Sequence, residues 1–264
     1  MVTVPSMFVL TKWYLDLVTD DGTAVVGYWA RLRWGPIRLG YVALLRSAPG
    51  RAPEERASAR RSDPPHEDDD LISWHCAPLR LTAAWRRESP SLGATLLDNA
   101  DGQIRWSCSM PRAQAMVEWD GVTHEGRGYA ELLQLTIPPH RLPFRTLRWG
   151  HHGSDRHAVV WIDWQGDSSR RWVWLDGAEQ PGATMTATGL ELEDGRAVRF
   201  TESRDLQRRP VAAALSPVAP VVRRWLMGSL GGMREHKQVS RSALTSADGG
   251  ELDAGWAVHE EVTR

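Results

Sequence analysis

The chain has almost no net charge, only two cysteines and no long hydrophobic run. Its 264 residues sum to a formal charge of -1, so no overall field attracts nucleic acid or anionic lipid. We therefore expect no nucleic-acid partner, although contact with a membrane surface through a local patch stays open. No stretch reaches the roughly 18 uninterrupted apolar residues of a membrane span. No signal peptide is evident in residues 1–18, which favours a cytoplasmic protein.

Motifs for metals and cofactors are missing as well. Cys76 and Cys108 lie far apart in the sequence, and in a cytosolic protein such a pair is more often two buried thiols than a disulfide or a metal site. His151 and His152 are adjacent, so in a strand they would point in opposite directions. The chain has no zinc-ligand spacing, no phosphate-binding glycine loop and no serine-hydrolase elbow. We expect no metal and no cofactor.

Tryptophan is abundant, whereas the other aromatic residues are scarce. The chain has 14 Trp against 3 Phe and 4 Tyr. A tryptophan buries a large, rigid surface and carries an N–H group that needs a hydrogen-bond partner. The excess fits either a wall around an apolar ligand or a tryptophan-rich β-core, and composition does not choose between the two.

Six Asp-Gly pairs predict tight turns between antiparallel strands. Asp-Gly is the strongest short hairpin signal, because a type I′ turn needs positive φ at both central residues. Short alternating runs such as "AVVGYWARLRW" and "AVVWIDW" flank these pairs. Many antiparallel strands with tight turns indicate an all-β fold, either a barrel or a sandwich. The pairs are Asp21-Gly22, Asp101-Gly102, Asp120-Gly121, Asp176-Gly177, Asp194-Gly195 and Asp248-Gly249.

Two segments interrupt the strand pattern, and a third suggests a boundary. Residues 46–70 form a polar tract rich in Pro, Arg and Asp, which we interpret as a mobile loop, either a lid over a barrel mouth or plain disorder. Residues 221–230 predict a short helix after a proline-rich stretch. Three prolines near residue 138 separate two halves that share a weak Arg-Trp-Gly echo. We expect two β domains, residues 1–137 and 138–264.

One acid lies in an unusual place. In "GRGYAELLQL", strand alternation puts Glu131 on the same face as Tyr129, Leu133 and Leu135. Burial among apolar side chains raises the pKa of a carboxyl group and keeps its proton at neutral pH. The alternative is a buried salt bridge with one of the 30 arginines, such as Arg148, which would keep the carboxylate ionised.

A second acid poses the same choice. Asp163 in "VVWIDWQG" shares a face with Val159 and Trp161. It is the second candidate for an acid, and a structural partner for an arginine is the favoured interpretation.

Several motifs together resemble a known family. "KWYLDLVTDDG", "EGRGYAE", "LPFRTLRWG" with "VVWIDW", "EHKQVSRSAL" and "GWAVHEEV" resemble the carotenoid 1,2-hydratase (hydroxyneurosporene synthase) and AttH-like group of lipocalin-like proteins. The resemblance implies two consecutive calycin-type antiparallel β-barrels. It also implies protonation of an isolated carbon–carbon double bond, followed by capture of the cation by water.

The resemblance also implies residue roles. The family's Tyr-x-Asp pair is matched by Tyr129 and Glu131, with Glu in place of Asp, while the strand upstream supplies Trp106 but no histidine. Glu131 would be the acid, Tyr129 would orient it, and indole rings would stabilise a carbocation. The candidates for substrate binding are Trp106, Trp149, Trp161, Arg148 and Trp29.

Three functional hypotheses follow. The first is a lyase of the hydratase type or a cyclase that acts, without a cofactor, on a polyene, terpenoid or polyketide-like molecule of secondary metabolism. The second is a ring-closing enzyme that holds its substrate in a reactive shape and needs no acid. The third is a lipocalin-like carrier that binds a hydrophobic small molecule without chemistry.

Overall fold

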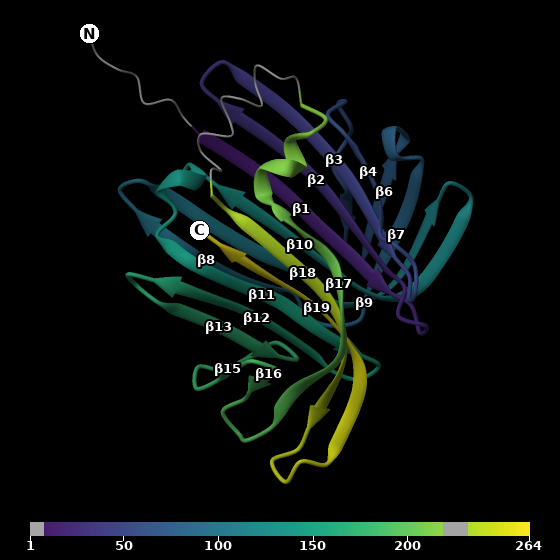
Figure 1. Ribbon diagram of the computed structural model, residues 1–264, viewed down its shortest axis with the longest axis vertical. Coiled ribbons are helices and arrows are strands. Elements are labelled where there is room, and N and C mark those ends of the chain that lie inside the picture. Colours follow the sequence, from purple (N-terminus) through teal and green to yellow (C-terminus); the bar gives the residue numbers. More distant parts are fainter. Residues whose placement is uncertain (1–7, 219–231) are drawn as a thin grey trace.

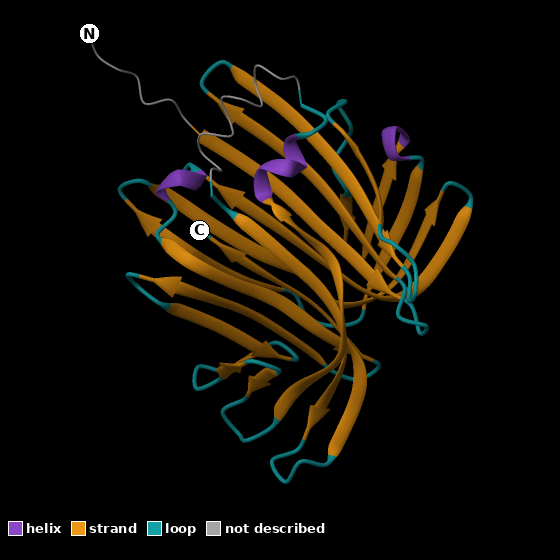
Figure 2. Cartoon of the chain, in the orientation of Figure 1, coloured by secondary structure: helices purple, strands orange, loops and turns teal. Residues whose placement is uncertain are grey.

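The computed structural model describes residues 8–218 and 232–264, which form two antiparallel sheets (Figure 1). Strands make up most of this part of the chain, and its only helices are three short 3-10 helices (Figure 2). The expected all-β fold is therefore confirmed. Among the described residues no helix is long and apolar enough to cross a bilayer. The helix predicted at residues 221–230 lies outside the described residues.

The first sheet has the strand order β4-β3-β2-β1-β10-β9-β7-β6-β5, with β8 paired to β9. The short 3-10 helix η1 (Ala77–Leu79) connects β6 to β7. The strands are β1 (Phe8–Val18), β2 (Ala24–Trp34), β3 (Ile37–Ser47), β4 (Glu54–Ser58), β5 (His66–Asp68), β6 (Leu71–Cys76), β7 (Leu81–Arg87), β8 (Leu92–Asn99), β9 (Gly102–Trp119) and β10 (Val122–Leu135).

The second sheet has the order β14-β13-β12-β11-β19-β18-β17-β16-β15. The 3-10 helix η2 (Pro139–Arg141) precedes its first strand, and η3 (Val211–Leu215) follows β17. The strands are β11 (Phe144–Ser154), β12 (Ala158–Gly166), β13 (Arg170–Leu175), β14 (Ala178–Glu179), β15 (Thr184–Thr186), β16 (Gly189–Glu191), β17 (Ala197–Pro210), β18 (Arg234–Thr245) and β19 (Glu251–Thr263).

All six Asp-Gly pairs lie between strands that pair with each other, which confirms the predicted turns. Only two of them have positive φ at both residues. These are Asp120 and Gly121, at 51° and 79°, and Asp176 and Gly177, at 50° and 91°. The pair therefore predicts the place of a turn more reliably than its type.

The segment at residues 46–70 is not the unstructured loop that its composition predicts. It contains β4, which pairs with β3, and β5, which pairs with β6. Its contacts are polar: Arg56 forms an ion pair with Asp120 at 2.6 Å, and the Trp29 indole N–H donates to the Ser62 carbonyl at 3.0 Å. The segment is ordered because the sheet edges offer it backbone hydrogen bonds, although it has little apolar surface of its own to bury.

Strand alternation divides the side chains among three cores. On β1, Trp13 and Leu15 face a core enclosed by the first sheet, whereas Tyr14 faces a core shared by both sheets. On β12, Trp161 faces a core enclosed by the second sheet, and Ile162 faces the shared one. A residue's parity along its strand therefore decides whether it lies inside one sheet or between the two.

Glycine at the β9–β10 turn is required by the backbone and not by packing. Gly121 has φ +79° and nothing within 4 Å of a built Cβ, whereas Gly153 in β11 is equally uncrowded but has no positive φ. We expect Gly121→Ala to lower the free energy of unfolding by about 1 kcal/mol, because the left-handed region is unfavourable for a residue with a Cβ. Gly153→Ala should stay within about 0.5 kcal/mol of the wild type. Urea denaturation of both variants measures the difference, and equal stabilities would contradict it.

Candidate active site between the two sheets

A cavity of about 220 Å³ lies between the two sheets. Its walls are mainly apolar, with Leu133 and Leu135 from β10 facing Phe144 from β11 and Ile162 from β12. This volume is smaller than the roughly 300 to 1,000 Å³ of typical small-molecule pockets. Four acidic or basic side chains also line the cavity: Lys12, Glu131, Glu235 and Glu260.

Glu131 is buried at the wall of this cavity, and three donors converge on one of its oxygens. Oε2 accepts hydrogen bonds from the Trp106 indole at 2.5 Å, the Tyr129 hydroxyl at 2.7 Å and the Trp149 indole at 2.9 Å. Trp106 and Tyr129 belong to the first sheet and Trp149 to the second. Both sheets are therefore needed to build the surroundings of this carboxyl group.

The pKa of Glu131 is raised above its ordinary value. Burial is the largest cause, and it outweighs the hydrogen bonds from Trp106, Tyr129 and Trp149 and the charge of Lys12, all of which favour the ionised form. An oxygen that already accepts three hydrogen bonds has no lone pair left for a proton. The proton of the neutral acid therefore belongs on Oε1.

The salt bridge between Glu131 and Arg148 that the sequence left open is absent. Arg148 instead pairs with Glu261 at 2.9 Å, its cross-strand neighbour on β19. Among residues 8–218 and 232–264 no arginine forms an ion pair with Glu131. Arg148 also does not line the cavity, so its predicted place in substrate binding is not supported by its position.

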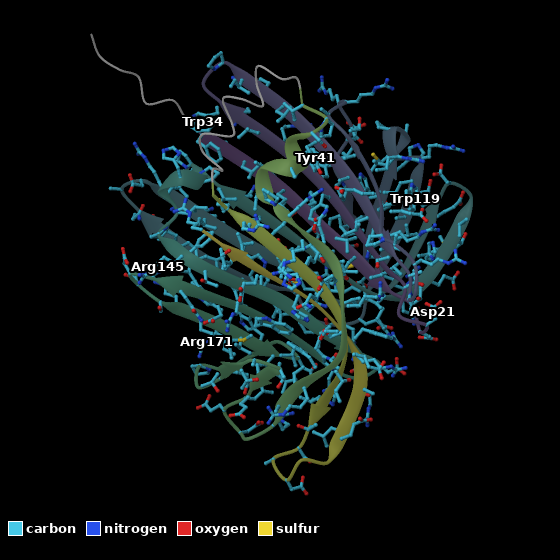
Figure 3. The ribbon with its side chains drawn as sticks, viewed as in Figure 1. Asp21, Trp34, Tyr41, Trp119, Arg145 and Arg171 are labelled. Carbon is cyan, nitrogen blue, oxygen red and sulfur yellow. The ribbon has the colours of Figure 1, made fainter. Side chains whose placement is uncertain are left out.

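Asp163 lies away from the cavity and is held by an arginine. Its carboxylate pairs with Arg171 at 2.9 Å and accepts a hydrogen bond from Gln165 at 2.8 Å. Asp163 shares its strand face with Trp161, which belongs to the core inside the second sheet. Figure 3 labels Arg171 on that sheet. The geometry therefore supports the favoured interpretation, in which Asp163 is a structural partner of an arginine.

Two of the predicted tryptophans also lie elsewhere. Trp161 packs inside the second sheet, against Phe200 at 5.6 Å between ring centroids, and Trp29 packs inside the first. Neither lines the cavity. Strand alternation directs both side chains into the core that their own sheet encloses, away from the cavity. Of the five predicted substrate-binding residues, the structure brings Trp106 and Trp149 to the site.

A second tyrosine–acid pair lies beside the first and was missed by the sequence. Tyr14 faces Glu131 across the β1–β10 ladder, and Asp16 faces Tyr129. The Tyr14 hydroxyl donates to Asp16 Oδ2 at 2.8 Å, and His151 Nε2 lies 2.8 Å from the same oxygen. The His151 ring stacks on Tyr129, with centroids 4.1 Å apart. A histidine therefore adjoins the site after all, although it comes from β11 and not from the strand upstream.

The far side of the cavity contains a buried ion pair. Lys237 on β18 is fully buried and pairs with Glu260 on β19, and its ammonium group lies 5.5 Å from the centroid of Trp149. Glu235 pairs with Arg209 at 2.8 Å. The Lys237 charge lowers the pKa of Glu260 against the opposing effect of burial. Arg209 also pairs with Glu55 at 2.7 Å, so Glu235 shares its cation, and the charge of Lys12 adds to that of Lys237 at Glu260.

Two signals in the sequence could have identified these residues. The Tyr-x-acid pattern at Tyr129 also occurs at Tyr14 and Asp16, within a strand that alternates in the same way. The chain has 30 arginines but only two lysines, Lys12 and Lys237, and both lie at this site. The two positions that have lysine in place of arginine therefore point to this site.

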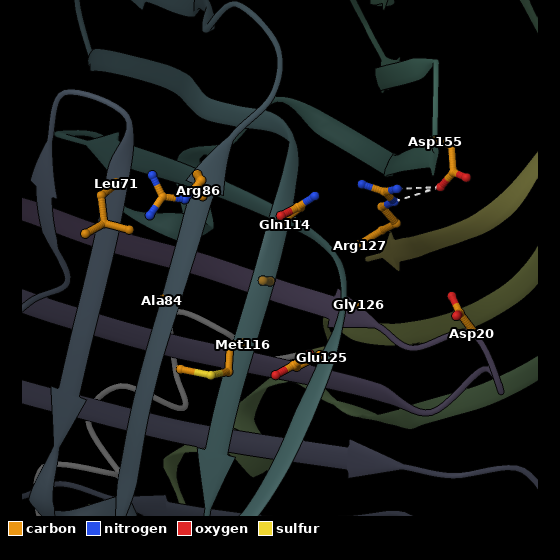
Figure 4. A pocket seen from close by; sticks show the side chains of 11 residues that line it. Asp20, Leu71, Ala84, Arg86, Gln114, Met116, Glu125, Gly126, Arg127 and Asp155 are labelled. Atoms are coloured by element: carbon orange, nitrogen blue, oxygen red, sulfur yellow. Dashed lines mark hydrogen bonds and ion pairs between the residues drawn. The ribbon is translucent and has the colours of Figure 1, made fainter.

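A larger hollow elsewhere is polar and open. It has a volume of about 610 Å³ and lies on the outside of the first sheet (Figure 4), where Arg86 and Gln114 line it and Arg127 pairs with Asp155 at 2.5 Å. It has few apolar walls and no buried acid. Among the described residues no group of three His, Cys, Asp or Glu side chains is arranged to hold a metal ion.

The fold of this chain is similar to that of solved structures, whereas its sequence has low identity to theirs. No protein-family model and no curated protein matches it. An AttH-like protein from Nitrosomonas europaea, NE1406, superposes with a TM-score of 0.59 at 13% identity over 98% of this chain and 92% of its own. The chain has the AttH-like fold. This agrees with the fold that the sequence motifs imply.

Two further structures share this AttH-like fold. CghA, solved with Sch210972, has a TM-score of 0.55 at 12% identity and covers 98% of this chain and 89% of its own. Kievitone hydratase from Nectria haematococca has a TM-score of 0.52 at 9% identity and covers 96% and 88%. At such low identities the likeness is one of fold.

Two buried histidines should make the protein sensitive to mild acid. Burial lowers the pKa of His152 to about 4, helped by His151, and lowers that of His259 to about 4, helped by His236 and Lys237. In the unfolded chain both return to an ordinary value near 6.5, so below that pH the unfolded state binds more protons. Stability should be full above about pH 6.5 and fall as the pH drops towards about 4.

Urea denaturation across this pH range measures the effect. His152 accepts or donates only one hydrogen bond in the described part, to Ser242 at 2.7 Å, so His152→Gln keeps a polar partner there and removes the titrating ring. The variant should show a shallower pH dependence than the wild type. An unchanged slope would contradict the assignment.

Proposed function

We propose that the protein is an enzyme that protonates a carbon–carbon double bond of a hydrophobic polyene, terpenoid or polyketide-like substrate, leading to hydration or cyclisation. Glu131 is the acid and Tyr129 is a positioning residue for it. The observation that carries the proposal is the position of Glu131: a buried carboxyl group with a raised pKa, at the wall of an apolar cavity, with three donors on one oxygen.

The burial of Glu131 and its three hydrogen-bond donors serve opposite stages of a proton transfer. Burial raises the pKa and keeps the acid protonated before the reaction. The donors Trp106, Tyr129 and Trp149 then stabilise the carboxylate that forms when the proton leaves, because hydrogen bonds to the charged form are the stronger ones. The same arrangement thus stores the proton and accepts the negative charge.

The proton transfer can be written with all atoms balanced. The Oε1–H bond of Glu131 breaks while the alkene π electrons form a new C–H bond, leaving a carbocation on the neighbouring carbon and a carboxylate on Glu131. In hydration, water forms a C–O bond to the cation and returns one proton to Glu131. In cyclisation, a second double bond forms a C–C bond to the cation, and loss of a proton to Glu131 regenerates the acid.

Indole rings support the cationic stage. Trp106 lines the cavity, and its ring stacks on that of Trp174 with the centroids 5.0 Å apart. Trp149 already has the Lys237 ammonium near its ring. Because that like charge opposes a second cation, Trp106 is the better carbocation stabiliser, with a contribution on the order of 0.5 to 2 kcal/mol.

The fold neighbours support this proposal without deciding it. One of them is named a hydratase, and another was solved with the small molecule Sch210972. The AttH-like fold is thus compatible with both a hydratase and a ligand-binding cavity. Fold alone does not assign activity, so the proposal depends on the residues around Glu131.

Glu131→Gln is the central test. It keeps the shape and an acceptor for the three donors but removes the acidic proton, so we expect turnover to fall by about 100-fold or more. Wild type and variant are incubated with an apolar extract of the source cells in water labelled with heavy oxygen, and products are followed by mass spectrometry. Hydration adds one labelled water to the substrate, whereas cyclisation gives an isomer without label.

Two further variants make the result specific. Glu261→Gln, on the second sheet and paired with Arg148 outside the cavity, should leave turnover unchanged. Tyr129→Phe removes one of the three donors to Glu131 and should lower turnover by about tenfold, with a shifted pH profile because the carboxylate loses a hydrogen bond. Full activity of Glu131→Gln would refute acid catalysis and favour ring closure by shape alone. A ligand that is bound and returned unchanged by the wild type would indicate a carrier.

A further inference from the structure

Lys12 is a half-buried cation that lines the mainly apolar cavity and forms no ion pair within the part of the chain that the structure describes. We infer that the substrate has an ionised carboxylate at one end, that Lys12 binds this group, and that the alkene at the other end lies against Glu131. This inference rests on the proposed function, because it assigns the substrate class of the same cavity. It makes the substrate a terpenoid or polyene acid and not a neutral hydrocarbon.

The glutamates that line the cavity form no ion pair with Lys12 among the described residues. Glu260 pairs with Lys237, and Glu235 pairs with Arg209. Glu131 has only uncharged donors. Among residues 8–218 and 232–264, Lys12 forms no ion pair, and its ammonium group lies 5.1 Å from the centroid of the Tyr28 ring.

The rest of the chain cannot supply the missing acid. Residues 1–7 and 219–231 contain no aspartate and no glutamate. A buried or half-buried cation is costly unless it is paired. The charge of Lys12 acts on Glu131 and Glu260, but neither acid forms an ion pair with it in the described residues, and a bound carboxylate would provide a direct partner.

The choice of lysine supports a dedicated role for this position. Arginine is the cation at 30 of the 32 basic positions, and both exceptions lie at this site. Lysine offers a compact charge that fits beside apolar walls, whereas arginine needs room for a planar fork of donors. Lys237 is unsuitable for the ligand, because it is fully buried, paired with Glu260 and not part of the cavity lining.

The register of the strands places the two ends of such a substrate. Lys12 faces Leu133 across the β1–β10 ladder, one position further along that face from Glu131. Both side chains therefore reach the same cavity from neighbouring strands. A carboxylate at Lys12 would direct the apolar body of the molecule into the cavity, where an alkene meets Oε1 of Glu131.

The test compares a monoterpenoid acid with the alcohol of the same skeleton. Geranic acid and geraniol are titrated into the wild-type protein by calorimetry, with methyl geranate as a second neutral probe. We expect geranic acid to bind about tenfold more tightly than either neutral probe, because a hydrogen bond between two charged groups is stronger than one to a neutral oxygen.

Two variants at position 12 separate charge from shape. Lys12→Met keeps the length of the side chain and should remove the preference for the acid while leaving the affinity for geraniol within about twofold. Lys12→Arg retains the charge and should keep a preference for the acid. Glu131→Gln should bind geranic acid in preference to geraniol as the wild type does, because it changes the reacting end only.

Each outcome decides the inference. Equal affinity of the wild type for acid and alcohol, failure to bind either, or an acid preference that persists in Lys12→Met would overturn it. A lost acid preference in Lys12→Met with normal binding of geraniol would establish it. The proposed function fails separately, when Glu131→Gln turns over substrate normally, and that result would leave an enzyme that binds an acid at Lys12 and closes a ring by shape alone.

Discussion

The structure depends on keeping one carboxyl group out of water between two sheets. Burial of Glu131 disfavours its charged form, yet a buried polar group is costly unless it is hydrogen-bonded. Three uncharged donors resolve this conflict, because indole and phenol N–H and O–H groups satisfy the oxygen without contributing a positive charge. Arginine at the same place would have given a conventional ion pair and a permanently ionised carboxylate.

The neighbouring pair at Tyr14 and Asp16 shows what a different partner changes. The two tyrosine–acid pairs lie opposite each other across β1 and β10, so their backbone surroundings are alike. Asp16, however, has an imidazole, His151, on its Oδ2, whereas Glu131 has indoles from Trp106 and Trp149. An imidazole can take up a proton and balance a negative charge, and an indole cannot. Of the two acids, Glu131 is therefore the one whose hydrogen-bond donors stay uncharged.

The sequence contained much of the fold and part of the site. Asp-Gly pairs located the hairpins, and alternation put Glu131 between Tyr129 and apolar neighbours. Alternation assigns side chains to two faces, but it does not say which face meets the other sheet. This is why Trp161 and Trp29 were expected at the site and lie in separate cores. The contact between Asp16 and His151 joins residues 135 positions apart, and no local pattern predicts it.

A site built between two sheets also constrains how such a protein can change. Trp149 reaches Glu131 from the second sheet while Trp106 and Tyr129 reach it from the first, so a shift of one sheet against the other would remove one donor and keep two. The hydrogen bond from Trp149 should thus be the most sensitive to packing at the interface. Lys237 of the second sheet is fully buried and paired with Glu260, and its ammonium group lies 5.5 Å from the ring centroid of Trp149 and 5.2 Å from that of Tyr14 on the first sheet. The Lys237–Glu260 ion pair thus lies beside the one donor to Glu131 that comes from the second sheet, so packing at this interface affects both.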